Sequence, residues 1–403
     1  MDSQEAIGII ELGNLNLKCL IYKINNNNQE ILSATTTPSE GIQNDVVMNL
    51  KKASDAIRLS ISTAEKKAKI SLKKIHVILE QPDFLCTRFS KQKKIDDSKI
   101  HRRDIEFLLK EAKKQLSLND KNQSIVHIFN HNYIVDGKIF IEEPIDVFAD
   151  SLTHEMTFIT APKNNLKNLN QIFLDCDIEI ERLISQTFAL GVELFKTEEL
   201  KSGVVLINIE SKKISLGLFK NLALVHSITF PVGMDHITND ISKVCSLNLE
   251  ESLAIRNNID FLFNNNQHLF DENNFLKESF FIDSKFRKIS KSLIFDIIKA
   301  RVEEILEMIK KQLTLTGFNF KSGANLFLTG EGANLKNLEK YFQDFLGLNT
   351  ILRRKDNLGK DFSASLGGIR IITEGWETEA IPETKAGNIE KAGFLRKIFR
   401  GFY

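Results

Sequence analysis

The feature that most constrains the fold is a strand–turn–strand pattern that occurs twice in the chain. The first copy covers residues 7–22, where an apolar strand enters a turn at Gly13 and an alternating strand follows. The second copy starts with the apolar run 204–209, passes through the polar turn 210–213 and returns over 214–219. Such runs joined by short turns predict β-hairpins. Because further strand and helix patterns follow each copy, the chain is predicted to hold two related α/β domains.

Between the two copies the pattern of strands and helices changes, and residues 82–157 are predicted to form a separate small unit. A helix is expected over 102–116, where apolar residues recur at helical spacing. Short strands are expected to flank it at 126–129, 133–135 and 156–160. This pattern predicts an inserted α+β subdomain in the first domain.

Composition excludes several classes of protein. With 54 Lys and Arg against 53 Asp and Glu, the net charge is +1. The chain as a whole is therefore not expected to bind nucleic acid. Its four cysteines are far apart and form no CxxC pair, which argues against a disulfide framework and a zinc site. No apolar stretch reaches the ~18–20 residues of a membrane-spanning helix, and the acidic N-terminus has no signal core, so a cytoplasmic protein is expected.

Four short segments carry motifs of a known family. They are Ile-Ile-Glu-Leu-Gly at 9–13, Tyr-Ile-Val-Asp-Gly at 133–137, Phe-Pro-Val-Gly-Met-Asp-His-Ile-Thr-Asn-Asp-Ile at 230–241, and Leu-Thr-Gly-Glu-Gly-Ala-Asn-Leu at 328–335. The third segment is fairly specific for the family, because it combines Pro-x-Gly with Ile-Thr-x-Asp. With these motifs the sequence resembles the actin, Hsp70 and hexokinase superfamily, and within it the FtsA family of bacterial cell division proteins.

The resemblance implies an α/β, actin-like (ribonuclease H-like) fold with duplicated domains. It implies the following parts: a first actin-like subdomain (1A) of residues 1–81 and 158–198, the inserted subdomain (1C) of 82–157, a second actin-like subdomain (2A) of 199–245 and 302–375, a small subdomain (2B) of 246–301, a polar linker of 376–392 and an amphipathic helix at 393–403.

The resemblance also implies a nucleotide site, in which the two hairpin turns grip the phosphates and a late glycine turn takes the adenosine. Backbone N–H groups in tight turns can bind anions, and glycine lets the backbone approach closely. The residues that map to this site are Glu11, Gly13, Asn14, Asn208, Gly233, Arg256, Gly330 and Gly332.

Several of these positions depart from the family pattern. Where the family has Asp-x-Gly-x-Gly-Thr, residues 208–213 put an amide at Asn208 and a carboxylate at Glu210. In the adenosine turn Glu331 replaces a glycine. The family also has an Ala-Glu-x-x-Lys motif at the edge of the adenine; here Arg256 stands at its basic position, and the acidic position has lost its carboxylate. Together these losses predict weak or lost binding of ATP with Mg²⁺ and no hydrolysis. The alternative is that these turns are purely structural and bind no nucleotide. The histidines are scattered, so neither a catalytic residue nor a metal ligand is expected.

The last eleven residues have the pattern of a helix that lies on a membrane surface. At about 100° per residue one face is apolar and the other is basic. The apolar face holds Phe394, Leu395, Ile398, Phe399 and Phe402, and the basic face holds Arg396, Lys397 and Arg400. This composition is typical of an interfacial helix, although a terminal helix docked on its own domain is the alternative. Together with this composition, the family resemblance implies peripheral attachment to the anionic cytoplasmic face of the inner membrane.

The family resemblance implies partners as well. These are the C-terminal tail of the tubulin-like protein FtsZ, further copies of the chain in an actin-like polymer, and downstream division proteins. The best match to a surface for the FtsZ tail is Arg301 with Glu304, at i and i+3 on a long helix predicted over 290–315. An intrahelical ion pair is the alternative. The implied role is an adaptor that anchors the FtsZ ring, and the alternatives are the actin-like adaptor of type IV pilus assembly or an ATP-hydrolysing kinase or chaperone.

Overall fold

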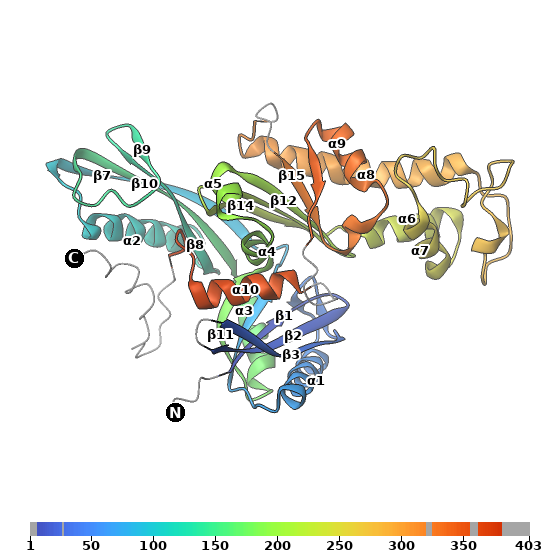
Figure 1. Ribbon diagram of the computed structural model, residues 1–403, viewed down its shortest axis with the longest axis horizontal. Helices are drawn as coiled ribbons and strands as arrows, with labels where there is room; N and C mark the ends of the chain where they lie inside the picture. The colour runs from blue at the N-terminus through green and yellow to red at the C-terminus, as the bar shows by residue number, and fades with distance from the viewer. Residues whose placement is uncertain (1–5, 26–27, 320–324, 355–361, 381–403) are drawn as a thin grey trace. The chain divides into compact units, whose positions relative to one another are not determined.

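The structure is a computed structural model of the 403-residue chain. It describes residues 6–25, 28–319, 325–354 and 362–380 (Figure 1). The chain divides into two compact units, one of residues 1–203, 217–228 and 355–403 and the other of residues 204–216 and 229–354. No helix in the described ranges has the length and apolar character needed to span a membrane. The predicted helix at 393–403 and most of the predicted linker lie outside the described residues.

The first unit is built on a five-stranded sheet with the order β11-β6-β1-β2-β3. Its strands are β1 (Ile7–Glu11), β2 (Asn16–Asn25), β3 (Asn28–Pro38), β6 (Lys74–Leu79) and β11 (Glu179–Ser185). The predicted first hairpin is confirmed, because β1 and β2 pair antiparallel. A two-stranded ribbon, β4 (Ile42–Gln43) with β5 (Val46–Val47), precedes the first helix.

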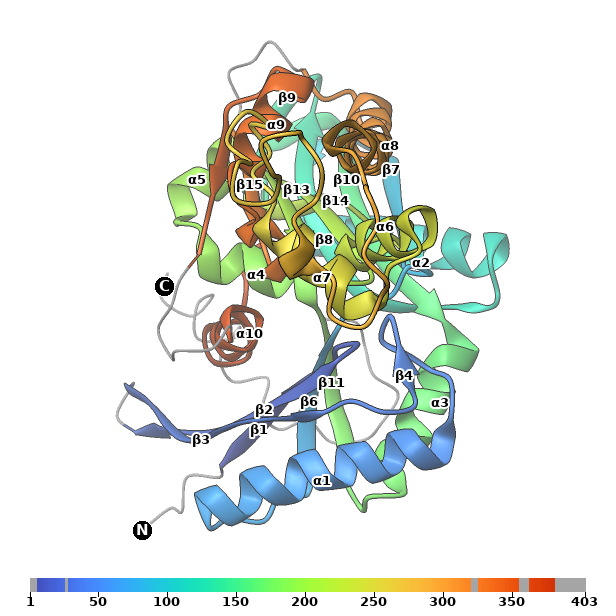
Figure 2. The same cartoon turned by 90° about the vertical axis from the view of Figure 1, so that its right-hand side faces the viewer.

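Helices cover both faces of this sheet. Figure 2 shows α1 (Leu50–Ala68) below the strands and α10 (Ser363–Glu374) above them. The other helices of the unit are α3 (Lys163–Leu174), α4 (Gln186–Leu194) and α5 (Thr197–Ser202). The side chain of Asn49 accepts a hydrogen bond from the N–H of Lys52 and so caps the start of α1. Gly367 brings α10 close to α4, because a Cβ there would lie 1.9 Å from the carbonyl oxygen of Ala189.

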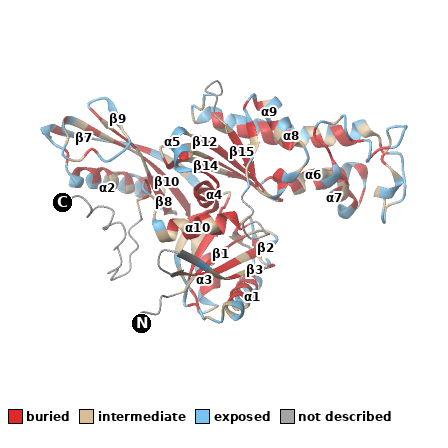
Figure 3. Ribbon diagram, viewed as in Figure 1, coloured by how far each residue is buried: buried red, intermediate tan, exposed pale blue. Residues whose placement is uncertain are grey.

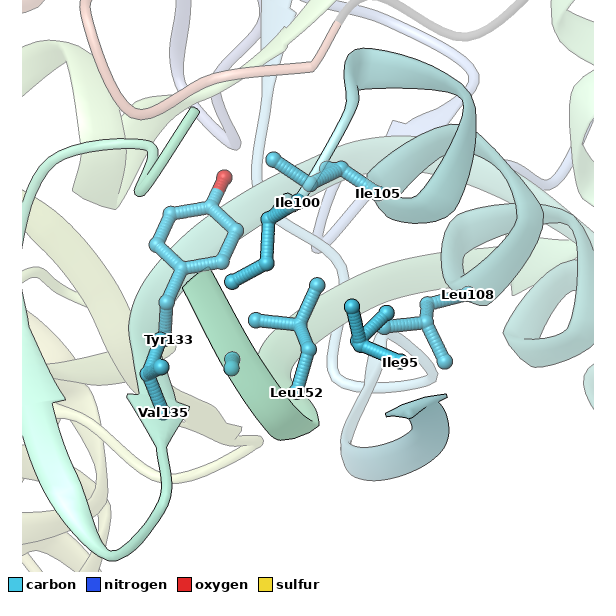
Figure 4. Close-up of a cluster of buried hydrophobic side chains, with 8 residues drawn as sticks. Ile95, Ile100, Ile105, Leu108, Tyr133, Val135 and Leu152 are labelled. Atoms are coloured by element: carbon cyan, nitrogen blue, oxygen red, sulfur yellow. The ribbon is translucent and has the colours of Figure 1, made fainter. Parts of the chain in front are cut away.

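The insert is a four-stranded antiparallel sheet, in the order β7-β10-β8-β9, with one helix. Its elements are β7 (Leu85–Lys99), α2 (Arg102–Asn119), β8 (Gln123–Val135), β9 (Lys138–Phe140) and β10 (Phe148–Pro162). Figure 4 shows part of the core between α2 and the sheet, which includes Ile95, Ile100, Ile105, Leu108, Tyr133, Val135 and Leu152. The predicted α+β character of the insert agrees with this architecture.

The strands of the insert differ from the prediction in length and number. The expected strands at 126–129 and 133–135 are parts of one strand of 13 residues, and that at 156–160 is part of one of 15 residues. The apolar pattern of β8 is interrupted by three polar residues, Asn130, His131 and Asn132. The pattern therefore predicted two strands where there is one. Strand β7 was not predicted, because lysines occupy much of it and only two of its apolar side chains, Phe89 and Ile95, are buried.

A second five-stranded sheet holds the other predicted hairpin, and its residues outside 217–228 belong to the second unit. The five-stranded sheet β14-β13-β12-β15-β16 consists of β12 (Val204–Ile209), β13 (Ile214–Lys220), β14 (Ala223–Phe230), β15 (Leu326–Thr329) and β16 (Thr350–Leu352). All six residues of β12 and all four of β15 are buried, which fits their unbroken apolar sequence (Figure 3).

The helices of this unit are α6 (Met234–Cys245), α7 (Leu249–Asn258), α8 (Lys291–Leu315) and α9 (Leu338–Leu346), with short 3₁₀ turns at Glu278–Phe280 and Glu331–Asn334. Helix α8 matches the predicted range, and the hydroxyl of Ser290 caps it. Helix α9 starts at Leu338, directly after Asn337, which adopts a left-handed conformation with φ of 61°.

The last described residues, 376–380, attach to the edge of β8 inside the first unit. The N–H of Asn130 donates to the carbonyl of Thr378 at 2.7 Å, and the N–H of Ala380 donates to the carbonyl of Ile128 at 2.9 Å. The carboxylate of Glu379 is buried between His127 and Arg182, with N–O distances of 2.6 Å and 2.5 Å. Burial alone would raise the pKa of Glu379, but these two side chains lower it to about 2.

Replacing Glu379 by Gln should loosen this attachment. Arg182 would lose its charge partner, so we expect the free energy of unfolding to fall by about 2–3 kcal/mol, less than for a fully buried pair because Arg182 is 22% exposed. Because the pKa of Glu379 is lowered on folding, its stabilising effect should be complete above pH ~4.5 and be lost towards pH 2.

Denaturant unfolding measures this loss, and hydrogen exchange at the amides of Asn130 and Ala380 shows where it occurs. Glu377→Gln is the matched control, since Glu377 is exposed and two residues away. Equal stability and equal amide protection in the two variants would contradict the expectation.

Candidate functional site

The carboxylate of Glu11, at the end of β1, is enclosed by donors of the first unit. It is 4% exposed. One oxygen accepts from Lys18 Nζ at 3.1 Å and from the side-chain amide of Gln186 at 3.3 Å. The other accepts from the hydroxyl of Ser365 at 3.1 Å. This residue of the implied nucleotide site is thus held by an ammonium group and two neutral donors of the chain.

Gly13 and Asn14 form the turn that follows Glu11. A Cβ at Gly13 would lie 2.6 Å from the carbonyl oxygen of Asn16, so the turn needs glycine there. The side chain of Asn14 accepts from the N–H of Asn44 at 2.7 Å and donates to the Asn44 side chain at 3.2 Å. The first turn therefore keeps its close backbone approach, and the amide of Asn14 ties it to a neighbouring loop.

The second turn, residues 208–213, is closed by its own side chains. Asn208 Nδ2 donates to Glu210 Oε1 at 2.9 Å, and the N–H of Glu210 donates to the carbonyl of Lys213 at 3.0 Å. Lys213 is fully buried, and its Nζ lies 3.7 Å from Glu210 Oε2. The acid and base that replace the glycine and threonine of the family pattern thus lie next to one another.

Three of the predicted glycines surround this second turn. A Cβ at Gly330, where φ is 90°, would lie 2.4 Å from Asn208 Oδ1. A Cβ at Gly233 would lie 2.5 Å from the carbonyl oxygen of Glu210, and one at Gly332 would lie 2.5 Å from Met234 Cγ. The structure therefore brings Asn208, Gly233, Gly330 and Gly332 together, while their role with a nucleotide stays a prediction.

Arg256 lies on α7 and is engaged by the start of α6. Its Nη1 donates to Asp235 Oδ1 at 3.3 Å. The N–H of Asp235 in turn donates to the carbonyl of Ser211 at 2.8 Å. Arg256 is therefore linked to the second turn through one intermediate residue, and its partner acid comes from another helix.

Two acidic residues in this unit make contacts that the sequence did not predict. Glu331 Oε1 accepts from the N–H of Ser211 at 3.0 Å and from the Ser211 hydroxyl. Glu251 is fully buried and accepts from three consecutive N–H groups of residues 282–284. Burial would raise the pKa of Glu251, but these hydrogen bonds lower it to about 2. The capping box of Asn248 and Glu251 was a readable signal for the second of these residues.

The predicted partner-binding pair on α8 is part of a three-residue cluster. Arg301 donates to both oxygens of Asp240 on α6, at 2.6 Å and 3.1 Å, and to Glu304 at 2.5 Å. The neighbouring carboxylates raise the pKa of Arg301, with Asp240 as the main contributor. The intrahelical pair with Glu304 is present, and the stronger bidentate contact joins two helices. The role of the pair in binding FtsZ stays a prediction.

Among the described residues, no group of three or more His, Cys, Asp and Glu side chains could hold a metal ion.

The insert and the whole chain have recognisable relatives. Residues 85–160 match the model of the SHS2 domain inserted in FtsA. The chain is 24% identical over 394 residues to the cell division protein FtsA of Bacillus subtilis (strain 168), an alignment that covers 96% of this chain and 87% of that protein. It is 21% identical over 362 residues to FtsA of Agrobacterium fabrum (strain C58 / ATCC 33970), covering 86% of this chain and 81% of the relative.

The fold itself has solved counterparts. A chain of the PilM-PilN type IV pilus biogenesis complex superimposes with a TM-score of 0.60 at 13% identity, and the match covers 90% of this chain and 96% of that one.

The duplicated hairpins, the two five-stranded sheets and the insert that matches the SHS2 domain give this chain the actin-like ATPase fold. Within that class it resembles the cell division protein FtsA along most of its length, as the sequence predicted.

Proposed function

We propose that the chain acts in bacterial cell division as an FtsA-like adaptor, which anchors the FtsZ ring to the cytoplasmic face of the inner membrane. The observation that carries the proposal is the presence of an SHS2 insert of the FtsA type within an actin-like fold. Eight relatives named as cell division protein FtsA align with 76–96% of the chain. Self-assembly into an actin-like polymer and recruitment of downstream division proteins are part of the same proposal.

The type IV pilus adaptor is the second candidate, and its support is the similarity of fold to the PilM-PilN complex. At 13% identity that similarity concerns the fold alone. The match of the insert to the FtsA domain model favours the division role. An ATP-hydrolysing kinase or chaperone is disfavoured by the contacts of Glu11, Asn208 and Glu210, whose polar groups are engaged by other side chains of the same unit.

We expect the C-terminal segment to carry the membrane attachment. Burying five large apolar side chains contributes up to ~7–15 kcal/mol, and three cations near anionic lipid add about 1 kcal/mol each. Ordering eleven residues costs ~10 kcal/mol or more. One copy should therefore bind weakly, and a polymer should bind by avidity.

Co-sedimentation with anionic vesicles tests this expectation. Deletion of residues 393–403 should release the protein, and Phe399→Glu should weaken binding because it puts a charge on the apolar face. Asn388→Glu is the matched control, since it adds the same charge to the polar linker. Unchanged sedimentation of the deletion variant would refute the membrane proposal.

We expect the FtsZ C-terminal tail to bind through Arg301, and variants can separate this role from the structural one. Arg301→Ala should weaken tail binding roughly tenfold if a charge-assisted hydrogen bond to the tail is lost. Asp240→Asn removes the structural partner and keeps the guanidinium, so it should bind the tail at least as well as the wild type.

The measurement is fluorescence anisotropy with labelled FtsZ tail, alongside the cytoplasmic tail of a pilus membrane protein. Equal losses in both variants would assign Arg301 a purely structural role. Binding of the pilus tail alone would replace the division proposal with the pilus one.

A further inference from the structure

An acidic side chain from a distant segment occupies the turn between β12 and β13. The N–H of Ser211 donates to Glu331 Oε1 at 3.0 Å, and the hydroxyl of the same serine donates to the same oxygen. The two residues are 120 positions apart in the sequence. Glu331 opens the 3₁₀ turn that follows β15 (Glu331–Asn334). Both segments belong to the second unit, so the contact lies within one compact body.

In this geometry one backbone N–H and one hydroxyl hold a carboxylate oxygen at a turn. Main-chain N–H groups in a tight turn at the end of a strand form a concavity that favours negative charge. A hydroxyl beside the N–H supplies a second donor, and bonds to an ionised acceptor are about twice as strong as neutral ones. Ser211 is 8% exposed and Glu331 is exposed, so the carboxylate covers the turn from the solvent side.

The backbone around the turn is shaped to place Glu331 there. Gly330 has φ of 90°, and any side chain at that position would collide with Asn208 Oδ1 and the carbonyl oxygen of Ile209. The acid within the turn, Glu210, has its own donors in Asn208 and Lys213. Ser211 therefore donates to Glu331, while the nearby carboxylate of Glu210 contacts Asn208 and Lys213.

We propose that Glu331 is the resident anion of this turn, and that a phosphate group can bind there only when the carboxylate is removed. A phosphate and a carboxylate accept hydrogen bonds from the same donors, and both are negative, so they compete for the Ser211 N–H and hydroxyl. The second unit therefore keeps this turn in an anion-filled arrangement without a nucleotide. The inference concerns the turn itself and does not depend on the proposed division role.

Anion rescue in the full-length protein tests the proposal. Glu331→Ala should lower the melting temperature in chloride, and inorganic phosphate at equal ionic strength should restore it. We expect the apparent affinity of Glu331→Ala for phosphate to exceed that of the wild type by roughly tenfold or more, the factor for one charge-assisted hydrogen bond. Glu307→Ala is the matched control, because it removes an exposed glutamate from α8.

Two further comparisons sharpen the result. Glu331→Gln keeps an acceptor of the same shape without the charge, so it should respond to phosphate in the same direction as Glu331→Ala. ATP with Mg²⁺, titrated beside inorganic phosphate, separates a nucleotide from a free phosphate, and preferential rescue by either ligand supports the proposal. A phosphate response of Glu331→Ala equal to those of the wild type and Glu307→Ala would overturn it. A phosphate response of Glu331→Gln equal to that of the wild type would also overturn the proposal, because it would show that the turn accepts any hydrogen-bond acceptor and does not require an anion.

Discussion

Carboxylates enclosed by donors of the same chain are the constraint on which both units depend. A buried carboxylate is costly unless hydrogen bonds or opposite charges surround it. Glu379 meets this need through Arg182 on β11 and His127 on β8, and in doing so joins the last described segment to both strands. Glu251 meets it through the backbone of residues 282–284, which fixes a loop of the second unit against α7. In each case one acid joins segments that are distant in sequence.

The same principle operates at the two turns that the family resemblance assigns to a nucleotide. Glu11 is held by Lys18 and Ser365 in the first unit, and Ser211 is matched with Glu331 in the second. Donors and acceptors that could serve a phosphate or a hydrated metal ion are thus engaged within each unit. We propose that the chain has kept the actin-like architecture as a scaffold for assembly and attachment, with little dependence on ATP.

Local sequence patterns predicted much of the fold, and non-local contacts explain what they missed. The hairpins at 7–22 and 204–219 and the helix α8 follow from apolar periodicity within short windows. Strand β7 was not predicted because its exposed face is rich in lysine and because it pairs with β10, which is distant in sequence. The contacts of Glu331 with Ser211 and of Glu379 with His127 span 120 and 252 residues, a distance at which no periodicity gives a signal. The domain boundaries, the partner surfaces and the terminal membrane helix stay predictions.

The affinity of the purified wild-type protein for ATP, measured by calorimetry with and without Mg²⁺, tests the central claim most directly. The account predicts binding no tighter than about millimolar, with little change on adding Mg²⁺, because the donors of both turns are already engaged. Micromolar binding that requires Mg²⁺ would contradict it, since it would show that the turns open to a nucleotide despite Lys18 and Glu331.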